Sequence, residues 1–115
     1  MKIFIAIFLF ISLMTSCSLT STTYIKPNES FVLGNNQHGK FSVKLKNIST
    51  TNLTIWLMPL DGGKHSPIDI KPNETVKVKV DKNTALTIEN NHPSEASVEL
   101  VVKGDTGLSM GYKSK

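Results

Sequence analysis

The chain has 115 residues, of which 39% are hydrophobic, and its formal net charge is +4 at pH 7. This length suits one domain, and the single cysteine excludes an internal disulfide. All 13 basic residues are Lys, which lacks the planar fork that Arg offers to phosphate and guanine, so the composition argues against nucleic-acid binding.

Residues 1–16 have the layout of a secretory signal peptide. A lysine at position 2 precedes an apolar run from Ile3 to Met14, which is too short to span a bilayer as a helix. Two small residues, Thr15 and Ser16, then lead to Cys17, the only cysteine of the chain. The segment therefore predicts export, with cleavage close to Cys17.

This segment resembles a bacterial lipoprotein precursor, whose lipobox places small residues before a lipid-bearing cysteine. Met14 stands where that box prefers Leu, and the resemblance covers residues 1–17. It implies that Cys17 carries the lipid after cleavage, so that the protein would contact a membrane through a lipid anchor. Two alternatives stay open: a secreted protein cut near Ser16 with a free thiol, and an uncleaved anchor helix.

The same resemblance implies a place in the bacterial cell envelope. Ser18 is not the acidic residue that retains such lipoproteins at the inner membrane, so the outer membrane, facing the periplasm, is the expected location. Residues 17–23, the lipidated cysteine and a polar stretch, are expected to form a flexible tether. Residues 24–115 would form one domain.

Beyond Tyr24, apolar and polar residues alternate with a period of two, which is typical of antiparallel strands with one buried face. Clusters of Gly, Asn, Asp and Pro separate these runs. The pattern predicts about seven or eight short strands. They are expected near residues 31–34, 40–47, 53–60, 68–70, 75–80, 85–90, 97–103 and 108–113.

Such strands predict an all-β fold, an antiparallel two-sheet β-sandwich. Its pattern resembles an immunoglobulin-like sandwich without the Cys and Trp hallmarks of antibody domains. The sequence Ile-Lys-Pro-Asn-Glu occurs at residues 25–29 and again at 70–74, each time before an alternating run. We therefore expect an internal repeat of a three-strand unit, although the halves of a sandwich can also converge on one pattern.

The sequence offers little catalytic chemistry. His38, His65 and His92 fall in predicted turns, at no spacing typical of a metal site, and are expected to be exposed turn residues. No glycine-flanked Ser forms a nucleophile elbow, and the acidic residues are scattered. We therefore predict a protein that is not an enzyme and that needs no cofactor or metal.

Trp56, Met58 and Tyr112 are the candidate binding residues. If Ile55 and Leu57 face the core, Trp56 and Met58 point outward, where a tryptophan could stack on a sugar or seat a partner protein. The structural alternative is that Trp56 covers the lysine stems of residues 44 and 46 on a neighbouring strand. Tyr112 lies near the end of the chain, in an edge strand or a contact tail.

These observations support a leading hypothesis and two alternatives. The leading hypothesis is a lipid-anchored, non-enzymatic module that binds an unknown envelope protein. The first alternative is a carbohydrate-binding or peptidoglycan-binding module, and the second is an inhibitor of a hydrolase such as lysozyme.

Overall fold

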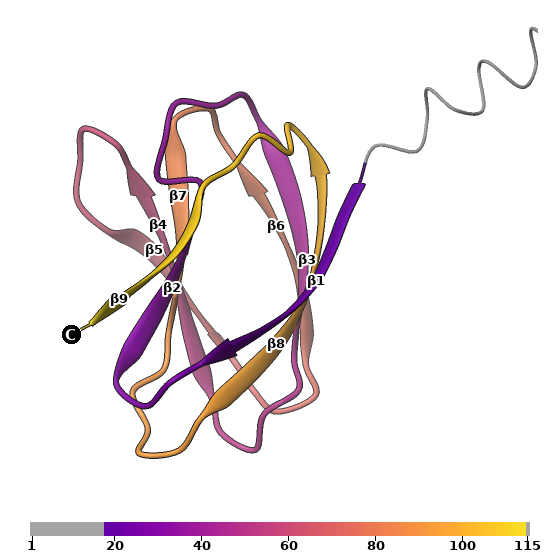
Figure 1. The fold of residues 1–115 in the computed structure, drawn as a ribbon, viewed down its shortest axis with the longest axis vertical. Helices are drawn as coiled ribbons and strands as arrows, with labels where there is room; N and C mark the ends of the chain where they lie inside the picture. The colour runs from indigo at the N-terminus through magenta and orange to yellow at the C-terminus, as the bar shows by residue number, and fades with distance from the viewer. Residues whose placement is uncertain (1–17, 115) are drawn as a thin grey trace, which may run out of the picture.

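The computed structural model describes residues 18–114 and contains two antiparallel sheets packed against each other, so the predicted all-β sandwich is confirmed (Figure 1). These residues contain no helix long and apolar enough to cross a membrane. The strands of the described chain are β1 (Ser18–Ile25), β2 (Glu29–Leu33), β3 (Phe41–Asn47), β4 (Leu53–Pro59), β5 (His65–Ile70), β6 (Thr75–Val80), β7 (Thr84–Glu89), β8 (Ala96–Gly104) and β9 (Met110–Ser114).

The strand order is that of a jelly roll. One sheet has the order β1-β8-β3-β6, and the other has the order β5-β4-β7-β2-β9. The first eight strands thus form two interlocking Greek keys, and β9 adds an edge strand beside β2. The expected immunoglobulin-like connectivity is therefore wrong, because that fold pairs its first strand with its second, whereas here β1 pairs with β8.

The segment expected to be a flexible tether forms strand β1 instead. It pairs with β8 along its whole length, from Ser18 opposite Lys103 to Ile25 opposite Ala96. Apolar alternation misses this strand because most of its residues are Ser or Thr, although the branched side chain of Thr favours a pleated surface. The described chain is therefore part of the sheet from its first residue, Ser18, and Cys17 lies outside the described residues.

The core lies between the two sheets and follows the predicted alternation. In β3, for example, Phe41, Val43 and Leu45 are buried, while the alternate residues Lys44 and Lys46 are exposed. Full burial of each such apolar side chain stabilises the fold by about 1.5–3 kcal/mol. One apolar cluster joins residues of all strands from β1 to β8 and fills the space between the sheets.

The two Ile-Lys-Pro-Asn-Glu segments form the same turn. The backbone N–H of Glu29 donates to the Lys26 carbonyl at 3.1 Å, and that of Glu74 donates to the Lys71 carbonyl at 3.0 Å. The Asn of each turn has a positive φ, 59° in the first and 66° in the second, which Asn tolerates better than most residues. The larger repeat of a three-strand unit stays a prediction.

A buried asparagine from elsewhere in the chain holds each of these turns. The side-chain nitrogen of Asn47 donates to the carbonyl of Ile70 at 3.0 Å, and that of Asn90 donates to the carbonyl of Ile25 at 3.1 Å. Both side chains are fully buried. Both also accept a hydrogen bond from the backbone N–H two residues later, at Ser49 and His92.

The prediction of an exposed turn histidine at position 38 is wrong. His38 is 9% exposed, and its ring packs edge-on against Phe41 with centroids 5.1 Å apart. Its Nδ1 lies 2.6 Å from the carbonyl oxygen of Gly39, and its Nε2 lies 2.9 Å from that of Thr84. His65 is exposed, but it begins β5 rather than lying in a turn.

Asp105 joins two loops near this histidine. Its carboxylate accepts hydrogen bonds from the backbone N–H groups of Gly39 at 2.6 Å and of Gly107 at 2.8 Å. These two bonds, that of Gly39 first, hold the pKa of Asp105 below its ordinary value of 3.8, and the nearby His38 contributes in the same direction. The carboxylate thus stabilises the loop arrangement in its ionised form.

Candidate functional site

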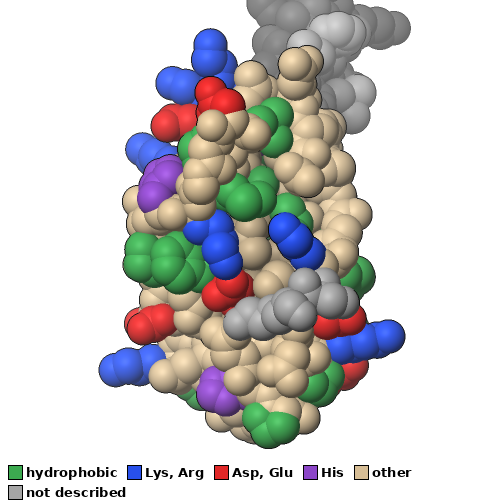
Figure 2. Space-filling view, turned by 90° about the vertical axis from the view of Figure 1, so that its left-hand side faces the viewer, with side chains coloured by type: hydrophobic (Ala, Val, Ile, Leu, Met, Phe, Trp, Pro, Cys, Tyr) green, Lys and Arg blue, Asp and Glu red, His purple; other side chains and the backbone are tan. Residues whose placement is uncertain are grey.

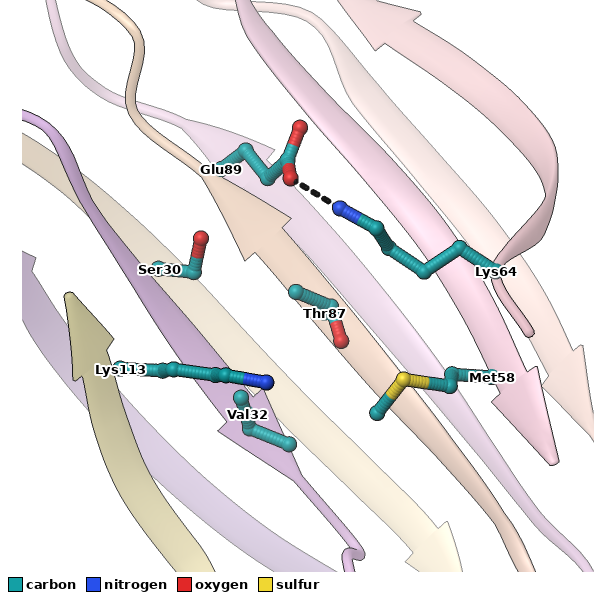
Figure 3. A pocket seen from close by; sticks show the side chains of 7 residues that line it. All are labelled: Ser30, Val32, Met58, Lys64, Thr87, Glu89 and Lys113. Atoms are coloured by element: carbon teal, nitrogen blue, oxygen red, sulfur yellow. Dashed lines mark hydrogen bonds and ion pairs between the residues drawn. The ribbon is translucent and has the colours of Figure 1, made fainter. Parts of the chain in front are cut away.

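The candidate site is a groove on the outer face of the five-stranded sheet. Strand alternation points Ser30 and Val32 of β2, Met58 of β4, and Thr87 and Glu89 of β7 to this face. The groove encloses about 500 Å³, a volume within the range of small-ligand sites. Its lining is completed by two lysines that reach it from opposite sides (Figure 3).

Lys64 reaches the groove from the loop that connects β4 to β5. Its Nζ lies 2.6 Å from Glu89 Oε2 and 5.4 Å from the centroid of the Trp56 ring. The side chain therefore closes one side of the groove by pairing with the acid and covering the indole. Figure 2 views the molecule from the side of this sheet, where basic side chains lie close to an acidic one near the middle of the face.

Glu89 is a nearly buried carboxylate, with 10% of its side chain exposed. Its Oε1 accepts a hydrogen bond of 2.8 Å from Trp56 Nε1, and its Oε2 accepts one from Lys64. Paired charge and hydrogen bonds offset the cost of removing an ion from water. Both carboxylate oxygens thus hold Trp56 and Lys64 in place. These two side chains form one wall of the groove.

Lys113 reaches the groove from the opposite side, in β9. Its side chain crosses β2 toward Val32 and Thr87 (Figure 3). Among the described residues its ammonium group forms no ion pair. Because Lys64 and Glu89 compensate each other, Lys113 gives the described lining residues a net positive charge.

Thr87 forms the floor of the groove and is 5% exposed. Its Oγ1 is buried and has no hydrogen-bond partner within residues 18–114. In Figure 3 this oxygen points to the side where Val32 and Met58 lie. A buried polar atom is nearly always hydrogen-bonded in a folded protein, so this hydroxyl needs a partner that the described residues do not supply.

The three predicted binding residues do not come together. Met58 lines the groove, and Trp56 stands beside it as part of the wall, half-buried. Tyr112 lies on the other side of β9 from Lys113, where its ring packs edge-on against Phe31 with centroids 5.5 Å apart. Cys17, the predicted lipidation site, lies outside the described residues.

The alternative role for Trp56 predicts contacts with Lys44 and Lys46, and these partners are wrong. Both lysines lie in β3, which belongs to the four-stranded sheet, whereas Trp56 lies in the five-stranded sheet. A lysine does pack over the indole, but it is Lys64 from the adjoining loop.

Tyr112 belongs to a second hollow, of about 390 Å³, at one end of β1, β2 and β9. Tyr24 and Tyr112 are both 57% exposed and are joined there by charged side chains. Sequence reasoning missed Tyr24 as a site residue, because in the sequence Tyr24 only marks the start of the predicted domain. The full lining of this hollow is Tyr24, Lys26, Glu29, Glu95 and Tyr112.

Sequence reasoning also missed most of the groove. Thr87 and Glu89 alternate with apolar residues in β7 and therefore look like ordinary solvent-facing positions, yet every residue of that strand is buried. The weak signal in the sequence is the Gly-Gly-Lys run at residues 62–64, which predicts a turn that ends in a lysine.

Neither a protein-family model nor a curated protein matches the chain. Solved structures do. The capsular polysaccharide assembling protein CapF from Staphylococcus aureus aligns with a TM-score of 0.56 and 16% identity, over 74% of this chain and 24% of that one. This chain thus spans about a quarter of CapF.

Two other solved structures have a similar fold. The mitogen derived from Yersinia pseudotuberculosis aligns with a TM-score of 0.52 and 19% identity, over 81% of this chain and 94% of that one. A sugar phosphate isomerase of the cupin superfamily from Silicibacter pomeroyi aligns with a TM-score of 0.53 and 10% identity, over 84% and 68%. At these identities the likeness establishes the fold alone, and a shared fold does not assign function.

Proposed function

We propose that this protein is a lipid-anchored, non-enzymatic binding protein of the bacterial cell envelope, which holds its ligand in the groove of the five-stranded sheet. The observation that carries the proposal is the Thr87 hydroxyl, buried in the floor of the groove and unpartnered within the described chain. A ligand that forms a hydrogen bond with this oxygen would remove the free-energy cost of a buried hydroxyl without a partner.

The arrangement of Glu89 supports binding rather than catalysis. A general acid or base must be free to exchange a proton with the reacting molecule. Here both carboxylate oxygens accept hydrogen bonds, one from Trp56 and one from Lys64, so the acid is placed to hold the wall in position.

The lipid anchor is supported by the resemblance of residues 1–17 to a lipoprotein precursor. A lipid on Cys17 would place the domain at a membrane surface, and the outer membrane, facing the periplasm, is the proposed location. The anchor is tested by mass spectrometry of the protein purified from bacterial membranes. The expected result is an acylated Cys17 and a Cys17→Ser variant that leaves the membrane fraction. An unmodified Cys17 would contradict it.

The groove is tested separately, with the full chain labelled with ¹⁵N and kept in detergent micelles. Extracts of the bacterial envelope, separated into glycan, small-molecule and protein fractions, are added while the amide signals are recorded. We expect at least one fraction to shift the signals of Ser30, Thr87 and Lys113. If every fraction leaves these three signals in place, the groove is not a binding site.

A protein partner is a second candidate, at a different place. Tyr24 and Tyr112 are both 57% exposed beside the smaller hollow, and Tyr is enriched at the centres of protein interfaces. The test is photo-crosslinking from position 112 in living cells, with position 46 on the other sheet as the control. A partner captured from position 112 alone would support this surface, and equal capture from both positions would contradict it.

A further inference from the structure

We propose that the ligand of the groove is an acidic saccharide, with its carboxylate on Lys113 and a hydroxyl group on Thr87. This inference rests on the proposed function, because it assumes that the groove binds a ligand. It goes further by naming the chemical class, which three properties of the lining define.

The first property is charge. The groove is lined by two lysines and one acidic residue, Glu89, whose Oε2 forms an ion pair with Lys64 Nζ at 2.6 Å. Lys113 keeps an ammonium group that forms no ion pair with residues 18–114 and reaches toward the middle of the groove (Figure 3). A carboxylate on the ligand would give this ammonium its counter-charge, in a charge-assisted hydrogen bond.

The second property is the need for hydroxyl partners. Thr87 and Ser30 are both 5% exposed and lie on the paired strands β7 and β2, where Thr87 is opposite Val32 and Ser30 is opposite Glu89. A hydroxyl group can donate one hydrogen bond and accept others, so a polyol matches both side chains. The unpartnered Oγ1 of Thr87 is the atom that such a ligand would satisfy.

The third property is an apolar surface close to these hydroxyls. Val32 and Met58 lie on either side of Thr87 in Figure 3. A sugar ring presents C–H groups on its faces and hydroxyl groups at its edge, and so fits a site in which apolar and polar side chains alternate. An acidic peptide would satisfy Lys113 and can also bond hydroxyl groups, but it does not combine a C–H face with hydroxyl groups at its edge, which is the pattern that this lining matches.

Stacking on Trp56 is not part of this mode of binding. The indole is covered by Lys64 at 5.4 Å and its N–H is bonded to Glu89, so its role is to position the wall. The recognition we propose therefore depends on Thr87 and Lys113.

The experiment is a titration of the ¹⁵N-labelled full chain in detergent micelles with three probes of similar length. These are a trimer of galacturonic acid, a trimer of galactose and a trimer of glutamic acid. We expect the acidic sugar to shift the amide signals of Ser30, Thr87 and Lys113. We expect it to bind about tenfold or more tightly than the neutral sugar, since one charged hydrogen bond separates the two.

Two matched pairs of variants locate the contacts. Thr87→Val keeps the shape of the floor and removes its hydroxyl, whereas Thr22→Val makes the same change on exposed β1. Lys113→Gln removes the ammonium, whereas Lys46→Gln does so on the opposite sheet. Thr87→Val and Lys113→Gln should each weaken binding of the galacturonic acid trimer about tenfold, and the two control variants should not change it.

Three results would overturn the inference. Equal binding of the neutral sugar would remove the role of Lys113, and preferential binding of the glutamic acid trimer would replace the saccharide by a peptide. In both cases the groove would remain a binding site. A third result, in which none of the probes shifts the groove signals while an envelope fraction does, would reject the acidic saccharide and keep the proposed function.

Discussion

Asn47, the last residue of β3, and Asn90, the residue directly after β7, hold the two Lys-Pro-Asn-Glu turns in the same way. Each donates its side-chain amide to the carbonyl of the isoleucine before its turn, at 3.0 and 3.1 Å. Each also donates to the carbonyl four residues later, at Thr51 and Ser94. The amides therefore join strands that are distant in sequence, at one end of the sandwich.

Asn47→Ala should reduce the free energy of unfolding by about 3 kcal/mol, because it leaves several buried backbone groups without a partner. Urea denaturation followed by circular dichroism measures this loss. Asn91→Ala, which makes the same change at an exposed position of the β7–β8 turn, should cost less than about 0.5 kcal/mol. Equal losses in the two variants would contradict a structural role for the Asn47 amide.

Trp56→Phe should destabilise the protein by about 2 kcal/mol, because the phenyl ring cannot donate to the nearly buried Glu89 carboxylate. Since Trp56 is the only tryptophan, unfolding is followed by circular dichroism rather than by fluorescence. Tyr24→Phe, at an exposed aromatic residue, is the control and should leave stability within about 0.5 kcal/mol. A Trp56→Phe variant as stable as the wild type would mean that the indole N–H contributes nothing to the wall.

Thr87→Val should raise the stability of the ligand-free protein by about 1 kcal/mol, because it removes a buried hydroxyl that has no partner in the described chain. The measurement is thermal unfolding in the absence of added ligand, with Thr22→Val as the comparison. A gain in stability together with a loss of binding is the pattern expected of a residue that binds a ligand at a cost in stability. A clear loss of stability would show instead that the hydroxyl is already satisfied.

Asp105→Asn should make stability less dependent on pH. Because the pKa of Asp105 is lowered in the folded state, its stabilising contribution is fully present above the unfolded pKa and is lost as the pH falls through the folded pKa. The difference in unfolding free energy between wild type and variant should therefore be largest above about pH 4 and shrink in more acidic solution. Urea denaturation from pH 7 to pH 2 measures it, and Asp61→Asn, in an exposed loop, serves as the control. A difference that stays constant over this range would contradict the prediction.

The sequence allowed the strands to be predicted far better than their partners. Alternation located eight of the observed strands, because burial of one face imposes a period of two on residues such as Phe41, Val43 and Leu45. It could not predict that β1 pairs with β8 across the chain, because that choice depends on contacts between distant segments. The same limit explains why the polar sequence of β1 predicts a tether rather than a strand.

The groove was harder to predict than the fold. Met58 was identified by alternation, but Thr87 and Glu89 become buried only because other segments lie beside them. Lys64 lies in a loop and Lys113 lies in the edge strand β9. Alternation of polar and apolar residues does not predict that either lysine lines the groove. The residue type of Trp56 predicts a binding residue, whereas its hydrogen bond to Glu89 gives it a supporting role that no spacing in the sequence predicts.

Strand β1 also has a mechanical consequence. Its first described residue, Ser18, is paired with Lys103. An acyl group on the preceding cysteine would therefore be joined to the sheet without a long flexible linker. A force applied to that lipid would act directly on the backbone hydrogen bonds between β1 and β8. The domain could rotate relative to the bilayer only about the few backbone bonds between the lipid and Ser18. The orientation of the groove toward the surrounding envelope would then be restricted by the hydrogen bonds of a single edge strand.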